Sequence, residues 1–407
     1  MTFELSRRSM LLGMGGAGAA LGLSGCSSAS PEASAEVVPF RGEHQSGILT
    51  PAQQQMIMVA FDMVATRKED LVKLLTDWTL AAERMQAGDQ VNDPKVRDDV
   101  PPDDTGETLG LGPGALSITF GFGSSLFEKF KLEHKRPRVL ERGIPRMAAE
   151  KLDPAKGSTD LVIQICGEDP MVVLHAMHQF KRIAFGLASV RWMQLGYGRT
   201  SSTSEDQQTP RNFFGFKDGT SNIKAEDSKE ELNKHLWIQP EDEGGEWAAG
   251  GTYLCIRKIH MMMEVWDELI LSEQEKTIGR NKVEGAPLSG GEEFTDPDFT
   301  ALDEDGQPLI DIDSHVAIVH PDHNGGHRIL RRGYNYTEGL TDLGRLDAGL
   351  FFIAYVRDPS QSFIPILQRM ATDQMTEYLQ HVASSMYIVP PGIRDGDSYV
   401  GQRLLDA

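Results

Sequence analysis

Two segments carry residues that could do acid–base or ligand chemistry. The first, Gly215 to Asn222 (GFKDGTSN), places the Asp218 carboxyl group among glycines and small polar residues. A carboxylate in a tight loop can move protons, but Gly and Asp together are also typical of an ordinary turn. The second, residues 311–336, carries His315 and, sixteen residues later, Arg331. A single histidine on a predicted strand is more often a core residue than a ligand, so both interpretations stay open.

Weaker candidates lie nearby. His320, His323 and His327 could bind zinc or copper, although their Pro-Asp and Asn-Gly-Gly flanks favour a solvated turn. Residues 303–306 lack the glycine spacing of an EF-hand. The glycine-rich stretch 110–114 lacks the Lys-Ser/Thr of a phosphate-binding loop.

Composition narrows the class of protein. The 407 residues include 40 Lys and Arg against 60 Asp and Glu, a net charge of −20. Apolar content of 40% indicates a folded protein with one large or two medium domains. So acidic a chain is not expected to bind nucleic acid. Three cysteines cannot form a disulfide framework, and Cys166 and Cys255, in apolar strands, are expected to be buried and inert.

Hydrophobic periodicity predicts the elements that must position these groups. In the first half we expect strands at 53–65, 115–122, 161–166 and 190–195, and helices at 68–85 and 170–185. In the second half we expect strands at 251–259, 316–319 and 351–356, and helices at 265–278 and 363–381. Long acidic loops at 87–113 and 280–313 are expected to be functional or partly disordered.

Two such halves predict an α+β fold made by duplication of a split βαβ unit. We therefore expect two ferredoxin-like domains, each an antiparallel sheet with flanking helices. Their predicted bounds are 41–214 and 215–407.

The first 26 residues are predicted to be an export signal. Arg7 and Arg8 precede a glycine-rich run, residues 10–23, too short to span a membrane stably. The arginine pair resembles a twin-arginine signal. The run ends in Leu-Ser-Gly-Cys, which resembles a lipoprotein box with Cys26 as the lipidated residue. An ordinary cleaved signal is the alternative, and residues 27–40 are predicted to be a linker.

Seven blocks in order carry a family resemblance. They are GEHQSGI (42–48), TFGFG (119–123), TPRN (209–212), GFKDGTSN (215–222), GGTYL (250–254), ILRRGY (329–334) and FFIAYVRDP (351–359). On these blocks, residues 40–392 resemble the dye-decolorising peroxidases, a family of haem-b enzymes. The similar subgroup is exported and includes the iron-transport-associated peroxidase, or deferrochelatase.

The resemblance implies one haem b per chain, held in the C-terminal half. It makes His315 the axial ligand of the haem iron, with Asp373 accepting a hydrogen bond from the other imidazole nitrogen. Asp218 and Arg331 become the catalytic pair on the distal side.

Two further haem contacts follow less directly from the resemblance. Some family members carry Asn two residues after the distal arginine, where this chain has Gly333. Asn222 is therefore expected to supply a distal polar group, and Phe352 to wall the distal pocket. A structural role is the alternative for both.

The implied activity is reduction of hydrogen peroxide through a ferryl intermediate, with oxidation of dyes, phenols or metal ions. A carboxylate can shuttle the peroxide proton, and a guanidinium can stabilise the developing negative charge. The acidic chain would favour cationic reductants. Trp266, Tyr334 and Tyr336 could relay electrons, although we favour core or pocket-supporting roles for them.

The alternative function is a haem-handling, iron-releasing component of an iron-uptake system, with partners from that system. A non-enzymatic surface lipoprotein is a third class. In each case membrane contact is expected only through the lipid anchor, and the residues leave homo-oligomerisation open.

Overall fold

The computed structural model describes residues 35–92, 99–148 and 150–406. The export signal and lipoprotein box predicted for 1–26, and residues 27–34 of the predicted linker, lie outside the described residues. Across the part that is described, no helix combines the length and the apolar character needed to cross a membrane.

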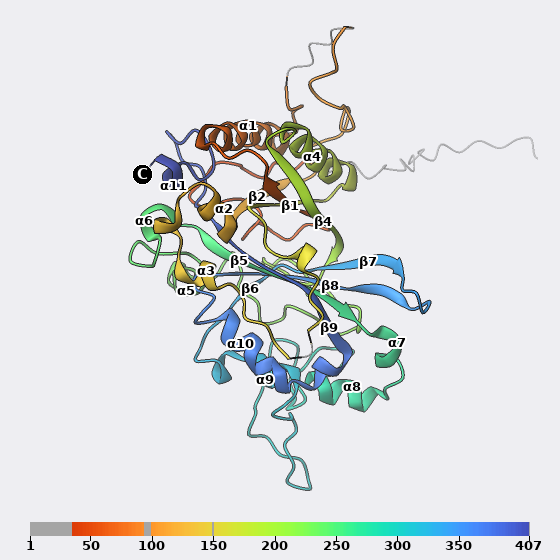
Figure 1. Cartoon of the computed structure of the whole chain (residues 1–407). Helices are drawn as coiled ribbons and strands as arrows, with labels where there is room; N and C mark the ends of the chain where they lie inside the picture. The colour runs from red at the N-terminus through yellow and green to blue at the C-terminus, as the bar shows by residue number, and fades with distance from the viewer. Residues whose placement is uncertain (1–34, 93–98, 149, 407) are drawn as a thin grey trace, which may run out of the picture. The chain divides into compact units, whose positions relative to one another are not determined.

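The N-terminal half runs strand, helix, strand, two short helices, strand, helix, strand (Figure 1). Its neighbouring strands are antiparallel, in the order β2-β3-β1-β4. The strands are β1 (Gln55–Met63), β2 (Ser117–Phe122), β3 (Leu161–Gly167) and β4 (Ala188–Arg199). The helices are α1 (Lys68–Gln86), α2 (Ser124–Lys129), α3 (Arg138–Arg142) and α4 (Pro170–Ile183).

The C-terminal half repeats this strand order, as β7-β8-β5-β9, again antiparallel. Its strands are β5 (Thr252–Met261), β6 (Leu330–Arg331), β7 (Tyr334–Leu340), β8 (Leu346–Val356) and β9 (Leu379–Val389). Its helices are α5 (Lys229–His235), α6 (Gly245–Ala248), α7 (Met263–Trp266), α8 (Leu271–Ile278), α9 (His315–Val319), α10 (Phe363–Arg369) and α11 (Gln402–Asp406).

The two sets of strands join into one barrel-like sheet. Phe122 of β2 pairs with Ile388 of β9, and Tyr197 of β4 pairs with Asn335 of β7. Because β5 pairs with both β8 and β9, the ring of strands closes. Both junctions are short, because β2 and β9 share one residue pair and β4 and β7 share two.

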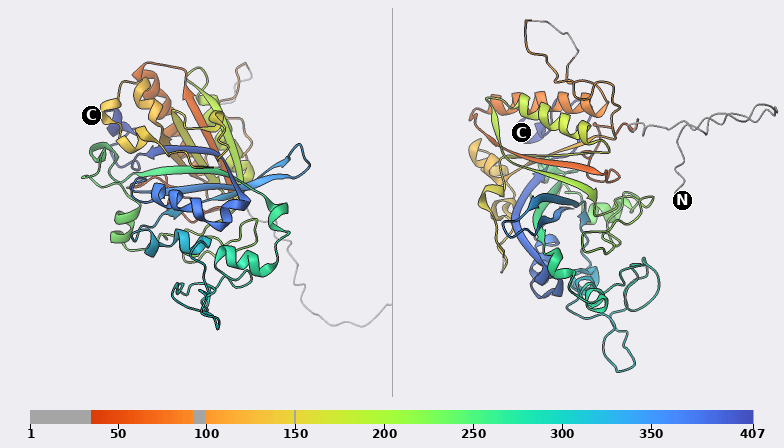
Figure 2. Two further views of the ribbon diagram at one scale, coloured as in Figure 1. Left: turned by 60° about the horizontal axis from the view of Figure 1, so that its bottom comes forward. Right: turned by 90° about the vertical axis from the view of Figure 1, so that its right-hand side faces the viewer.

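Helices α1 and α4 lie side by side over the N-terminal strands (Figure 2). Their contact is built on Trp78, whose ring packs on Phe61, Phe120 and Phe180. The indole N–H donates to the carbonyl of Phe180 at 3.0 Å, so the one polar atom of this buried ring is satisfied. Cys166 and Cys255 are buried free thiols, as predicted.

The structure corrects three sequence predictions in the C-terminal half. The segment 316–319, predicted as a strand, is part of the short helix α9. The helix predicted for 265–278 is two helices, α7 and α8, separated where Ile270 is extended (φ −67°, ψ 153°). The segment 363–381, predicted to be mostly helical, is α10 followed by the 3-10 turns Met370–Thr372 and Gln374–Tyr378, and only its last three residues belong to a strand, β9. Short apolar runs do not distinguish strand from helix, which explains the first error.

Candidate active site

A cavity of about 290 Å³ lies in the C-terminal half. Its wall is mostly apolar, with side chains from β5, β8, α8, α9 and α10. Among these are Ile259, Met261, Ile278, Val316, Leu350, Phe352 and Ile366. Three predicted site residues, Asp218, His315 and Arg331, also line it. A mostly apolar cavity with a few converging polar groups is typical of a ligand site.

His315 is the first residue of α9, and a backbone turn fixes where it lies. The preceding Ser314 is fully buried, and its hydroxyl donates to the carbonyl of Asp311 at 2.6 Å. The main-chain N–H of Ile318 donates to the carbonyl of Ser314, which closes the first turn of the helix. These hydrogen bonds fix the main chain at His315, so its imidazole lines the cavity in a defined position.

Asp373 orients that imidazole. Its fully buried carboxylate lies with Oδ2 2.6 Å from Nδ1 of His315, while Oδ1 accepts from the main-chain N–H of Met375 at 2.9 Å. With Nδ1 engaged, Nε2 is the ring nitrogen left to bind a ligand. This carboxylate–imidazole pairing fixes the tautomer and increases the basicity of a metal-binding histidine.

Asp218 and Arg331 form the second polar group of the cavity. Nη1 of Arg331 donates to Oδ1 of Asp218 at 2.8 Å, and both side chains are largely buried. Oδ2 receives only a 3.4 Å contact from Asn212. The loop that carries Asp218 needs glycine at Gly219, because φ is +88° and a Cβ would lie 2.9 Å from Cα of Ser201.

Asn222 lies behind the cavity wall instead of in it. Its Oδ1 accepts from the main-chain N–H of Arg331 at 2.7 Å, and its Nδ2 donates to the carbonyl of Arg331 at 2.8 Å and of Ser202 at 3.0 Å. Both amide atoms are therefore used up by the main chain. The expectation that Asn222 is a distal polar group facing haem gives way to a positioning role for Arg331.

Phe352 lies on the cavity wall, as expected, and its ring packs on Phe363 of α10 at 6.3 Å. Trp266, Tyr334 and Tyr336 are buried and do not line the cavity. Trp266 stacks on Phe214 at 4.3 Å, beneath the wall. Burial agrees with the core role favoured for Trp266, and because the two tyrosines do not line the cavity, a supporting role is the one left to them.

The polar groups of the cavity act on one another. Burial lowers the pKa of His315, but the adjacent Asp373 carboxylate outweighs burial, and the pKa is raised above its ordinary value. The charges of Asp218 and Arg331 also act on His315, in opposite directions. All four side chains therefore belong to one electrostatic site, although they come from distant parts of the sequence.

Sequence reasoning did not place five further residues in the wall of this cavity. Arg280, Arg328 and Lys217 contribute to its wall, as do His320 and His327. Arg280 is buried, and its Nη1 donates to the carbonyls of Gly285 and Glu293. Lys217 belongs to the GFKDGTSN block, and His320 and His327 belong to the histidine-rich loop that follows His315, so these three had a signal in the sequence. No motif marks Arg280, which lies in the loop after α8.

These residues fit a haem. One imidazole with a single free nitrogen opens onto the cavity and can bind the iron. The apolar wall suits the porphyrin faces, and the cations beside it suit the propionate carboxylates. The fit rests on His315 with its buried carboxylate partner and on the donors present in the wall.

Comparisons with known proteins agree with this fit. The family model described as Dyp-type peroxidase, N-terminal, matches residues 45–198, and its C-terminal counterpart matches residues 209–394. The deferrochelatase of Escherichia coli O6:K15:H31 (strain 536 / UPEC) is 36% identical, over 99% of this chain and 97% of the relative. The deferrochelatase of Yersinia pseudotuberculosis serotype I (strain IP32953) is 34% identical, over 99% and 95%.

Solved structures give the same answer. Ferric DtpA from Streptomyces lividans is 35% identical with a TM-score of 0.83, covering 91% of this chain and 98% of that one. The DyP-type peroxidase from Cellulomonas bogoriensis is 37% identical with a TM-score of 0.80, covering 91% and 99%. This chain therefore belongs to the Dyp-type peroxidase family and is a haem peroxidase.

Proposed function

We propose that the chain reduces hydrogen peroxide with Asp218 and Arg331 as its catalytic pair and oxidises dyes, phenols or metal ions. One observation carries this proposal. The Asp218–Arg331 pair and the His315–Asp373 pair meet at the same cavity. Haem, when bound, supplies the iron that takes up peroxide and holds the oxidising equivalents that reductants later remove.

Asp218 is suited to move the peroxide proton. Oδ1 is held by Arg331 at 2.8 Å, whereas Oδ2 has only the long Asn212 contact. Oδ2 is therefore the oxygen that accepts a proton from one peroxide oxygen and returns it to the other, which leaves as water. General acid–base catalysis of this kind contributes roughly 10²–10⁴-fold in rate.

Arg331 stabilises the negative charge that develops on the departing oxygen. Its Nη1 is bonded to Asp218, and its main chain is held on both sides by Asn222. A guanidinium fixed in this way does not need to reorganise during the reaction, which is the condition for strong electrostatic stabilisation.

His315 and Asp373 differ in role from Asp218 and Arg331, because they would act on the haem iron and not on peroxide directly. His315 would hold the haem iron through Nε2, while the buried Asp373 carboxylate holds Nδ1. A charged partner makes the imidazole a stronger donor, which favours cleavage of the peroxide O–O bond.

The test is the rate of peroxide-dependent dye oxidation by the haem-loaded protein and by Asp218→Asn. We expect the substitution to lower kcat roughly 10²–10⁴-fold with the haem content unchanged. A variant that keeps its rate would show that Asp218 is not the proton carrier.

A second candidate is iron release from haem, since the curated relatives that cover this chain end to end carry the name deferrochelatase. Iron release would use the same cavity and would also need partners from an iron-uptake system. Free protoporphyrin, measured by chromatography after incubation of the holoprotein without peroxide, would favour this function over peroxidase turnover.

The proposed location is outside the cytoplasm, reached by the twin-arginine route, with a lipid on Cys26. The Ser6-Arg7-Arg8 and Leu23-Ser24-Gly25-Cys26 stretches support it. Cys26→Ser is expected to move the exported protein from the membrane fraction to the soluble fraction. An unchanged distribution would argue for an ordinary cleaved signal.

The proposed domain division is two ferredoxin-like units, residues 41–214 and 215–407. The repeated strand order, β2-β3-β1-β4 and β7-β8-β5-β9, supports it. The two family models, which match residues 45–198 and 209–394, support the position of the boundary.

A further inference from the structure

A second polar site lies in the N-terminal half, where part of the long acidic loop meets α4. Side chains of α4 hold the loop by hydrogen bonds to two of its carbonyls and to the Thr105 hydroxyl. Arg182 donates to the carbonyls of Asp103 and Pro102, at 3.1 and 2.8 Å, and Gln179 donates to the hydroxyl of Thr105. These hydrogen bonds fix the position of the loop on α4.

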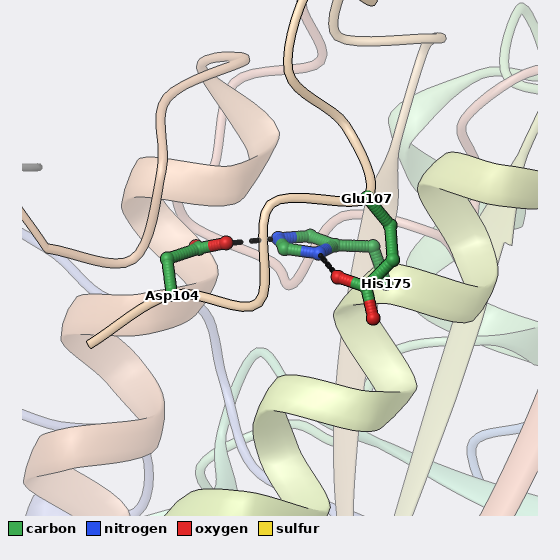
Figure 3. Close-up of side chains that lie close together, drawn as sticks. All are labelled: Asp104, Glu107 and His175. Carbon is green, nitrogen blue, oxygen red and sulfur yellow. Dashed lines mark hydrogen bonds and ion pairs between the residues drawn. The ribbon is translucent and has the colours of Figure 1, made fainter. Parts of the chain in front are cut away.

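His175 of α4 lies beneath this loop, between two carboxylates (Figure 3). Its side chain is only 3% exposed. Nδ1 lies 2.8 Å from Oε2 of Glu107, whereas Nε2 has no hydrogen-bond partner and faces Oδ2 of Asp104 at 3.4 Å. A buried ring nitrogen without a hydrogen bond is costly unless something else binds it.

The 3.4 Å distance between Nε2 of His175 and Oδ2 of Asp104 suits two ligands of one metal ion better than it suits a hydrogen bond. It is longer than the 2.7–3.2 Å usual for an N–H···O hydrogen bond. Two ligands bound at about 2.0–2.1 Å to one tetrahedral ion lie about 3.3 Å apart. Asp104, Glu107 and His175 also each offer one ligand atom, and these three atoms lie within 4.8 Å of one another.

The surrounding contacts hold these groups in place. Asp104 accepts main-chain hydrogen bonds from Val91 and Gly106, each at 2.8 Å, so its carboxylate cannot rotate freely. Glu107 is bonded by His175 and, through Oε1, by His178 at 2.7 Å. Burial raises the pKa of Glu107, but hydrogen bonds from Thr105 and the two histidines outweigh it and lower the pKa to about 2. The carboxylate is therefore charged at neutral pH.

We propose that Nε2 of His175 and the Asp104 carboxylate bind a divalent transition-metal ion of the zinc class, with water completing its coordination and Glu107 orienting the imidazole from Nδ1. An imidazole beside two carboxylates suits zinc or ferrous iron better than calcium or magnesium, which prefer oxygen alone. The three residues are not part of the haem cavity, so this site is separate from the peroxidase reaction. The rival explanation is a His175 that lies between the two carboxylates with no metal.

Zn²⁺ is the probe that tests this site. Haem-loaded full-length protein is stripped with a chelator, dialysed against about 10 µM Zn²⁺, and its bound zinc is counted by mass spectrometry. The wild type is expected to bind one zinc per chain, and Asp104→Asn and His175→Gln are expected to bind roughly 10- to 100-fold more weakly. Asn and Gln preserve size and hydrogen bonding, and the haem spectrum and circular dichroism report whether each variant is folded.

The matched control is His323→Ala, in the other histidine-rich loop, which is expected to retain the zinc. Zinc is also expected to raise the thermal unfolding temperature of the wild type but not of Asp104→Asn, because binding stabilises only a folded site. The proposal is overturned by a wild type that binds no zinc. Equal zinc binding in the wild type and in both variants would also overturn it, as would loss of zinc in His323→Ala alone.

Discussion

Asn222 offers the sharpest test of how the fold positions the distal arginine. Its side chain makes hydrogen bonds to both the N–H and the carbonyl of Arg331. Asn222→Ala leaves these two buried groups without those partners. Each such loss costs roughly 1–3 kcal/mol, so the free energy of unfolding is expected to fall by about 2–6 kcal/mol. The carbonyl of Ser202 also loses a donor but keeps Lys224.

The same substitution is expected to lower activity without loss of haem. Arg331 would no longer be fixed relative to Asp218, and a displacement of about 1 Å can cost roughly 10²-fold in rate. His315 and Asp373 make no contact with Asn222 among the hydrogen bonds found, so haem binding should be unaffected. The assays are urea unfolding, steady-state peroxide-dependent dye oxidation and the haem-to-protein ratio.

Asn335→Ala is the control. Asn335 is also buried, but its side chain makes one hydrogen bond, to the carbonyl of Gly198 at 2.9 Å, away from the cavity wall. We expect a loss of about 1 kcal/mol and unchanged activity. If Asn222→Ala were no less stable than Asn335→Ala and kept full activity, the positioning role of Asn222 would be refuted.

Three other substitutions test neighbouring features. Arg331→Leu is expected to lower kcat roughly 10²–10³-fold at normal haem content, because a fixed donor to the departing oxygen is lost; an unchanged kcat would refute this. Asp373→Asn keeps a hydrogen-bond acceptor but loses the charge beside His315, so haem transfer to apomyoglobin should become roughly 10- to 100-fold more favourable, and equal transfer would contradict it. His381→Gln tests acid stability. Burial and, next, the charge of Arg257 lower the pKa of His381 to about 3, and its Nδ1 accepts from Nε of Arg257. Since the unfolded chain takes up this proton near pH 6.5 and the folded chain does not, the wild type loses stability as the pH falls below about 6.5, by roughly 2 kcal/mol at pH 5. Urea unfolding at pH 7.5 and pH 5 should show a smaller loss in His381→Gln, and an equal loss would refute the assignment.

The elements of the N-terminal half were predictable from local patterns. Alternating apolar residues mark β2, and Asp169-Pro170 marks the start of α4, where the Asp169 carboxylate accepts from the N–H of Met171 at 2.7 Å. The C-terminal half was harder, because α9 is only five residues long and α10 stops well before β9. Local periodicity carries little information over so few residues.

Some residues of the site could be predicted from the sequence, and others could not. His315, Asp218 and Arg331 could be found because sequence blocks around them resemble a family, and the structure brings them to one cavity. The backbone role of Asn222 depends on how β6 passes the loop that follows Ser202, and no pattern in the chain records that approach. His175 and Asp104 are likewise brought together only by folding.

The absorption spectrum of the haem-loaded protein, before and after one equivalent of hydrogen peroxide, tests most directly whether His315 is the axial ligand of a peroxidase. It is measured for the wild type and for His315→Ala. We expect the wild type to show a ferric Soret band that changes at once with peroxide, and the variant to be purified without haem. A variant that keeps its haem and still reacts with peroxide would contradict the assignment of His315. A wild type that binds haem but does not respond to peroxide would contradict the peroxidase mechanism.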